Sequence, residues 1–221
     1  MKNCMNQNRR YKIVYEDDWL IVVDKPSGML VIPTPRGETR TLTALLNEEL
    51  DSRGVEANAH PCHRLDRDTS GLIIYAKGKK AQRLMMDEFK ERGVKKTYIA
   101  FVHGAVKKDF ETIEVPIYSR KKRRKEAAIT RYKVIERKKD YTVLEVEPVT
   151  GRTNQIRIHL KEIGHPLVGE DVYAFRRDFK LRFKRVALHA KVVEFTHPVT
   201  KKRLRFDSPL PADMQNFLKS Q

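Results

Sequence analysis

The chain has 221 residues, and its 46 lysines and arginines outnumber its 29 aspartates and glutamates, which gives a formal net charge of +17. A hydrophobic content of 40% is enough to build a folded core, which excludes global disorder. The positive excess says nothing about the fold, but it favours a polyanionic partner, and we predict nucleic acid. Because no apolar run approaches the length of a membrane span, we expect no membrane partner.

The chain holds two cysteines, Cys4 and Cys62, which is too few for a disulfide framework and is typical of a reducing compartment. The first residues lack the apolar stretch of a secretory signal. We therefore expect a cytoplasmic protein. No internal repeat and no Gly/Ser-rich linker divides the sequence, so we predict a basic tail over residues 1–10 and one domain over residues 11–221.

Hydrophobic periodicity and turn residues predict alternating short strands and helices along the chain. The predicted strands lie at residues 12–15, 19–24, 71–77, 96–104, 130–136, 141–149, 186–195 and 202–206. The predicted helices begin near residues 41, 81, 153 and 212, and the first three end at Gly54, Gly93 and Gly164. The order lacks a regular βαβ alternation. The fold class we predict is therefore α+β, with a mixed, largely antiparallel sheet flanked by helices.

The most informative stretch is HRLDRDTSG at residues 63–71, which places two carboxylates and two guanidiniums in six residues. It comes directly before the predicted buried strand at Gly71. Catalytic groups are often carried by loops that lead into rigid strands. The alternative is a charged turn with internal ion pairs, and composition alone does not choose between the two.

Other chemistry is conceivable in the same stretch. His60, Cys62 and His63 are potential metal ligands, but a closed zinc site needs four ligands and no second Cys/His pair supports one. Asp66 and Asp68 share a face of an extended segment at roughly 7 Å, a spacing that permits an acid/base dyad of the glycosidase type. The neighbouring serine lacks the G-x-S-x-G frame of a nucleophile elbow.

HRLDRDTSGL strongly resembles the H-R-L-D-x-x-T-S-G signature of the RluA-type pseudouridine synthases. VVDKPSGM, KTYIAFVHG and GRTNQIRIHL resemble three further motifs of that family, K-P-x-G, K-x-Y-x-A and G-R-T-H-Q-I/L-R-x-H. GHPLVGEDVY, LHAKVVEFTHP and SPLPADM match later landmarks in the same order. The similarity runs from about Tyr11 to Leu218. It implies a monomeric enzyme that isomerises uridine to pseudouridine in tRNA or rRNA stem-loops, without cofactor or metal.

The chain departs from the family pattern in three places. Asn154 stands where the family usually has histidine, which affects one neighbouring contact. The segment KEAAITRY resembles the K-x-A-x-T element with roughly one extra residue. No S4-like RNA-binding domain precedes the catalytic region.

The resemblance assigns a role to each candidate site residue. Asp66 is the catalytic carboxylate, Arg157 pairs with it, and Tyr98 stacks on the extruded uracil, as aromatic rings do on single-stranded bases. Arg64 enters the RNA where the base was, and Ile156 packs under the uracil. Plainer readings are a surface charge for Arg157, a core tyrosine for Tyr98, an ion-paired Arg64 and a core Ile156.

Six consecutive basic residues lie between strand-like segments, and we predict that they form a loop that grips RNA phosphates. They are Arg120, Lys121, Lys122, Arg123, Arg124 and Lys125. The rival from another functional class is a non-catalytic RNA-binding or ribosome-assembly protein on the same fold. A metal nuclease is the rival enzyme, and sensitivity to EDTA separates it from the cofactor-free reading.

Overall fold

The computed structural model describes residues 10–174 and 179–220. The chain forms two compact units, Met1–Gly93 with Phe195–Ser208 and Val94–Glu194 with Pro209–Gln221. The basic tail predicted for residues 1–10 lies outside the described residues, apart from Arg10. Within those ranges, every helix is too short or too polar to cross a lipid bilayer.

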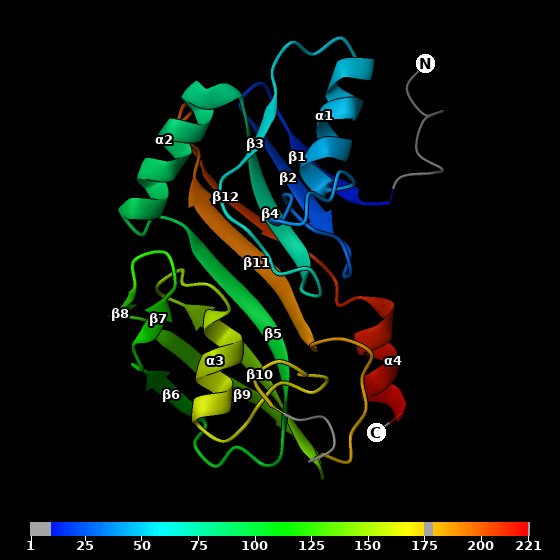
Figure 1. Cartoon of the computed structure of the whole chain (residues 1–221), viewed down its shortest axis with the longest axis vertical. Coiled ribbons are helices and arrows are strands. Elements are labelled where there is room, and N and C mark those ends of the chain that lie inside the picture. Colours follow the sequence, from blue (N-terminus) through cyan, green and yellow to red (C-terminus); the bar gives the residue numbers. More distant parts are fainter. Residues whose placement is uncertain (1–9, 175–178, 221) are drawn as a thin grey trace. The chain divides into compact units, whose positions relative to one another are not determined.

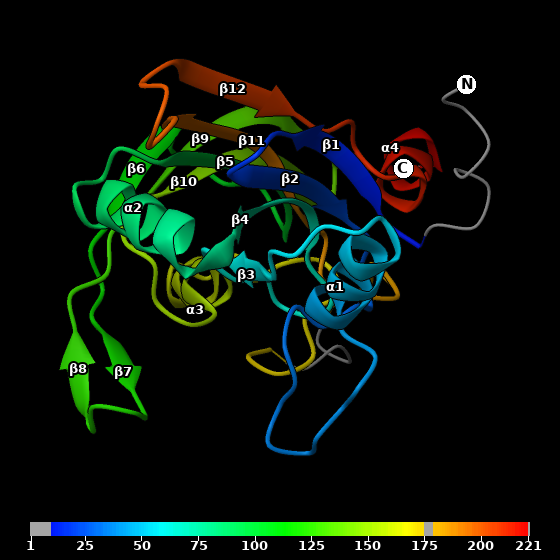
Figure 2. The same cartoon turned by 90° about the horizontal axis from the view of Figure 1, so that it is seen from above.

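The first unit combines antiparallel strands with two helices that lie on the same side of β1 and β2 (Figures 1 and 2). Strand β2 pairs with β1 on one side and with β4 on the other, and β3 pairs with β4. The elements are β1 (Lys12–Glu16), β2 (Leu20–Lys25), α1 (Leu42–Ser52), β3 (Ala59–Pro61), β4 (Ser70–Lys77), α2 (Gly78–Lys90) and β12 (Arg203–Asp207).

Helix α1 forms where the sequence supplies both a cap and an apolar face. The Thr41 hydroxyl accepts a hydrogen bond from the Ala44 N–H at 3.3 Å, which satisfies one of the donors that a helix start leaves unpaired. Leu42, Leu46 and Leu50 recur at helical spacing and are fully buried. This face packs into the core of the unit, where strands β2 and β4 are buried along most of their length.

The second unit is built on five antiparallel strands in the order β11-β5-β10-β9-β6. Its elements are β5 (Lys95–His103), β6 (Phe110–Ile113), β7 (Ile117–Ser119), β8 (Arg124–Glu126), β9 (Thr130–Arg137), β10 (Tyr141–Pro148), α3 (Gln155–Glu162), α4 (Ala212–Ser220) and β11 (Leu188–Thr196), of which residues 188–194 belong to this unit. Strands β7 and β8 pair only with each other, and their hairpin extends away from β9 and β10 past α3 (Figure 2).

An aromatic cluster forms the core between the strands and α4 in the second unit. The ring of Phe101 lies 5.9 Å from Tyr141 and 5.8 Å from Phe217, between ring centroids. Ile99 and Val143 belong to the same buried cluster. Residues that alternate along a strand share a face, so this cluster defines one face of β5 and β10, and Tyr98 and Ala100 lie on the other.

The structure confirms the predicted α+β class with its mixed, largely antiparallel sheet flanked by helices. The main predicted strands and all four predicted helices are present, with boundaries shifted by a few residues. Helix α3, for example, begins at Gln155 and not at Thr153. Strands β3 and β6, of three and four residues, were not predicted.

Candidate active site

The turn that carries Asp66 lies between β3 and β4 of the first unit. The Thr69 N–H donates to the Asp66 carbonyl at 3.2 Å, which closes a tight turn immediately before β4 begins. Leu65 is buried and anchors the turn from the other side, while Asp66 itself is half-buried. The carboxylate thus sits on a short turn between a packed leucine and a buried strand.

Lys25, at the end of β2, holds this turn from inside the protein. Its side chain is fully buried, and the ammonium donates to the carbonyls of Pro26, Met29 and Arg67 at 2.9, 2.8 and 3.0 Å. A buried lysine is rare unless its charge is satisfied, because hydrogen bonds must offset the loss of hydration. These three bonds tie the K-P-x-G segment to the backbone of the residue that follows Asp66. The sequence predicted only that this motif shapes the nearby loop.

The residues proposed as alternative metal ligands have other roles. The His63 Nε2 accepts a hydrogen bond from the Ile74 N–H at 3.1 Å, and its ring packs 5.4 Å from that of Phe89. Cys62 is buried, and burial raises the pKa of its thiol to about 12, so the thiolate that metals require is disfavoured. Among the residues that the structure describes, no group of three or more His, Cys, Asp and Glu side chains is arranged to hold a metal ion.

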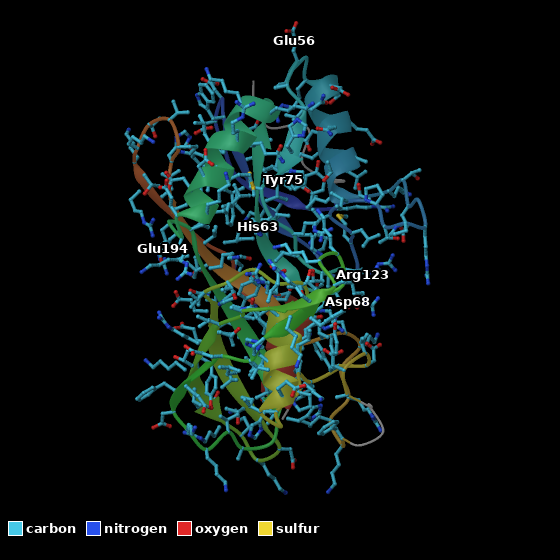
Figure 3. All side chains as sticks on the ribbon, turned by 60° about the vertical axis from the view of Figure 1, so that its left-hand side comes forward. Glu56, His63, Asp68, Tyr75, Arg123 and Glu194 are labelled. Atoms are coloured by element: carbon cyan, nitrogen blue, oxygen red, sulfur yellow. The ribbon has the colours of Figure 1, made fainter. Side chains whose placement is uncertain are left out.

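The charged side chains around Asp66 differ in their surroundings. Arg67 forms an ion pair with Glu38 at 3.3 Å, a residue from outside the HRLDRDTSG stretch. Arg64 is exposed, and we find no ion pair for it within the described part of the chain. Asp68 is half-buried, and Figure 3 labels it beside His63 and Tyr75 of the same unit. An exposed Arg64 is compatible with the predicted contact to RNA.

Tyr98 lies on the face of the second unit that α3 covers. The Gln155 side chain, at the start of α3, donates to the hydroxyl of Thr130 at 2.9 Å, so Thr130 faces the helix. Tyr132 lies two residues further on the same face of β9, opposite Val146, which in turn lies opposite Tyr98. Side chains of directly opposed residues share a face. Tyr98 is 7% exposed on that face.

Arg157 projects from α3 and is held by Glu170, a residue that the sequence did not single out. Its Nε and Nη2 atoms donate to the two carboxylate oxygens of Glu170 at 2.8 and 2.7 Å, a bidentate salt bridge. The two side chains are 11% and 1% exposed. Arg157 is therefore mostly buried, and the reading of it as a solvated surface charge does not fit.

Two neighbours of Arg157 were also predicted from the sequence. Ile156 is buried, which suits both the core reading and a position under a bound base. Asn154 adopts a left-handed backbone conformation with φ of +55° just before α3, a conformation that asparagine tolerates better than most residues. Its side-chain amide donates to the Tyr173 hydroxyl at 2.7 Å.

The basic run occupies the tip of the β7–β8 hairpin, where Figure 3 labels Arg123. All six residues are exposed. Lys122 is partly neutralised by Glu126, with 2.5 Å between Nζ and Oε1. Tyr118 on β7 is 58% exposed and lies opposite Lys125 in the strand pairing. An exposed aromatic ring among cations is the combination used by surfaces that bind single-stranded nucleic acid.

The structure distributes the predicted site residues over the two units. Tyr98, Ile156 and Arg157 belong to the second unit, and Arg64 and Asp66 belong to the first. The pairing of Asp66 with Arg157 stays a prediction. Sequence reasoning missed Glu170, although the only available signal, the motif GHPLVGEDVY, had been noted as a landmark.

Comparisons with known proteins agree with this site. A family model described as RNA pseudouridylate synthase matches residues 19–162. The chain is 39% identical over 219 residues to an uncharacterized RNA pseudouridine synthase of Bacillus subtilis, YlyB, across 94% of this chain and 72% of that protein. It is 37% identical to ribosomal large subunit pseudouridine synthase D of Pseudomonas aeruginosa, across 94% and 70% of the two chains.

A solved structure titled human RNA pseudouridylate synthase domain containing 4 shares the fold, with a TM-score of 0.80 and 23% identity over 94% of this chain and 91% of that one. The sequence relatives and the family model show that the chain belongs to the RNA pseudouridine synthase family, as the resemblance to the RluA type indicated. It is an enzyme that isomerises uridine to pseudouridine, and its partner is RNA.

Proposed function

We propose that Asp66 performs the isomerisation, on a uridine in a stem-loop of transfer or ribosomal RNA and without a metal or cofactor. The observation that carries the proposal is the buried clamp of Lys25 on the backbone that flanks Asp66. A protein that only binds RNA has no evident need to hold a single carboxylate on a turn fixed from the core. Catalysis does need it, because a reacting group must be kept in one geometry.

The reaction suits a carboxylate that acts alone. The N1–C1′ bond of uridine breaks, the uracil turns, a C5–C1′ bond forms, the C5 proton leaves and N1 carries a proton in the product. The atoms balance without an oxidant, a reductant or a second substrate. Asp66 contributes either as a nucleophile toward the sugar or the base, or as a base that removes a ribose proton. Both routes require the ionised carboxylate.

We propose that Arg157 orients Asp66 and that Tyr98 receives the uracil. Glu170 binds the edge of the guanidinium formed by Nε and Nη2, so the edge that includes Nη1 is the one suited to a second carboxylate. A planar fork fixes a carboxylate in a way that a point charge does not. The ring of Tyr98 offers a stacking surface for the extruded base, worth about 1–3 kcal/mol. Arg64 and Ile156 complete the proposed base-flipping site.

We propose that the basic hairpin at residues 120–125 binds RNA phosphates. Its exposed cations and exposed Tyr118 support this role. The relative from Pseudomonas aeruginosa is named for the ribosomal large subunit, which makes ribosomal RNA one candidate substrate. Transfer RNA stem-loops are the other candidate. Since both RNAs mature in the cytoplasm of bacteria, we place the enzyme there, acting as a monomer.

The test is tritium release from RNA that carries uridine labelled at C5, because that hydrogen leaves when the C5–C1′ bond forms. The wild-type protein should release tritium from transfer or ribosomal RNA in the presence of EDTA. Asp66→Asn should release none while it binds RNA normally, and Asp68→Asn should keep substantial turnover. Turnover by Asp66→Asn equal to the wild type would refute the mechanism. A protein that binds RNA tightly and releases no tritium from any RNA would instead support the non-catalytic alternative.

A further inference from the structure

The Glu170 carboxylate is the centre of a buried hydrogen-bond network in the second unit. Besides the two bonds from Arg157, its Oε1 accepts the backbone N–H groups of Asp171, Val172 and Tyr173 at 3.1, 2.9 and 3.3 Å. Burial alone raises the pKa of this carboxyl, but the bonds from Arg157 and the backbone outweigh burial and hold the pKa below its usual value. Glu170 is therefore charged at neutral pH although its side chain is 1% exposed.

The backbone that leads into Glu170 is fixed by an unusually close approach. Gly169 has φ of +82°, and a Cβ built on it would lie 1.8 Å from the Arg185 carbonyl oxygen. Only glycine fits there. Arg185 is itself held by Asp213, with its Nε and Nη2 atoms 2.7 and 2.9 Å from the two carboxylate oxygens, and by the Val186 carbonyl at 2.9 Å. Glu170 is thus anchored to the core of the unit.

A second contact fixes the plane of the Arg157 guanidinium. Its Cζ atom lies 5.3 Å from the centroid of the Tyr173 ring, within the range of a cation–π contact. The Tyr173 hydroxyl accepts the bond from Asn154 at the start of α3. Glu170 therefore binds the guanidinium along one edge while Tyr173 lies against the group, and both come from the segment that follows Gly169.

We propose that Glu170 is a positioning residue that fixes the guanidinium of Arg157 for the isomerisation reaction. The inference rests on the proposed function, because it takes Arg157 as the partner of Asp66. An arginine side chain has several rotatable bonds, and without a partner it samples many orientations. The bidentate salt bridge selects one of them before RNA binds. With 1% of its side chain exposed, Glu170 has no direct route to the substrate and acts through Arg157.

The test is the kinetics of Glu170→Gln, which keeps the size of the side chain and removes its charge. Glu162→Gln is the matched control, because Glu162 lies on α3 and its carboxylate is exposed in an ion pair with Lys161. A group displaced by about 1 Å loses on the order of 100-fold in rate, so kcat of Glu170→Gln should fall by about that factor while KM stays nearly constant. The control should match the wild type. An unchanged kcat in Glu170→Gln would overturn the inference.

A double-mutant cycle separates positioning from a general structural role. In an Arg157→Lys background, Glu170→Gln should cause little further loss of kcat, because the geometry that Glu170 maintains is already gone. Losses that multiply fully would overturn the inference. If Glu170→Gln does not fold, Glu170→Asp serves in its place, since it keeps the charge but is too short to reach Arg157 as before. Failure of the proposed function appears separately, as wild-type protein that releases no tritium from any RNA.

Discussion

Gly169→Ala links the backbone of the second unit to the candidate site, and its effect follows from two separate terms. The first is conformational, since φ of +82° is disfavoured for a residue with a Cβ by about 1–2 kcal/mol. The second is steric. The new Cβ would lie 1.8 Å from the Arg185 carbonyl oxygen and 2.7 Å from its carbonyl carbon, so the two backbones must separate. Forcing extra volume into a packed region costs about 1–3 kcal/mol.

The matched control is Gly164→Ala, which carries only the first term. Gly164 has φ of +81°, and a Cβ built there meets no atom within 4 Å. We therefore expect Gly164→Ala to lower the free energy of unfolding by about 1–2 kcal/mol. Gly169→Ala should lower it by about 2–5 kcal/mol, the sum of the conformational and steric terms. The difference between the two variants isolates the close approach to Arg185.

Two measurements check this prediction, urea denaturation and the rate of tritium release. Because the displaced segment carries Glu170, Gly169→Ala should also lose kcat, whereas Gly164→Ala should retain it. Equal unfolding free energies for the two variants would show that the close approach is relieved without cost. A destabilised Gly169→Ala enzyme with normal kcat would show that the segment does not control the site.

Three further predictions concern charge. The pKa of Glu170 is lowered in the folded protein, so its contribution to stability is present above the unfolded pKa near 4.5 and lost as the pH falls through the folded value; the stability gap between wild type and Glu170→Gln, measured by urea denaturation, should narrow below about pH 4.5, and a constant gap would refute this. Lys25→Met should leave buried carbonyls unpaired, cost about 1–3 kcal/mol in the same assay and lower kcat, whereas wild-type values would mean that the clamp is dispensable. Serines at residues 120–125 should flatten the dependence of log affinity on log salt by about 0.7 per lost single-strand contact, measured against Lys107→Ser, and an identical slope would exclude the hairpin from binding.

Hydrophobic patterns predicted most elements because their local signals were strong. Helix α1 has both a threonine cap and leucines at helical spacing, and β4 is a continuous apolar run that is buried on both faces. Strand β3 spans only Ala59–Pro61 and exists because β4 offers it a pairing edge. Strand β6 begins with Phe110, which is 79% exposed, so its pattern carries no burial signal. Pairing with a distant strand, and not local preference, defines these two elements.

The candidate site shows the same division. Asp66, Tyr98 and Arg157 were identified because each stands in a motif. Glu170 was not, because an acidic residue followed by Asp171 reads as part of a charged surface loop. Its burial depends on a glycine that fits only against a backbone carbonyl 16 positions later in the chain, at Arg185. The full burial of Lys25 was likewise invisible, since most lysines in sequences of this kind lie in solvent.

The central claim is that Asp66 converts uridine to pseudouridine in cellular RNA, and mapping of pseudouridines tests it most directly. Transfer and ribosomal RNA should be compared from cells that lack the gene and from the same cells supplied with wild-type, Asp66→Asn or Asp68→Asn protein. We predict that at least one pseudouridine is absent without the gene, returns with the wild type and with Asp68→Asn, and stays absent with Asp66→Asn. Restoration of that site by Asp66→Asn would contradict the assignment of the catalytic carboxylate.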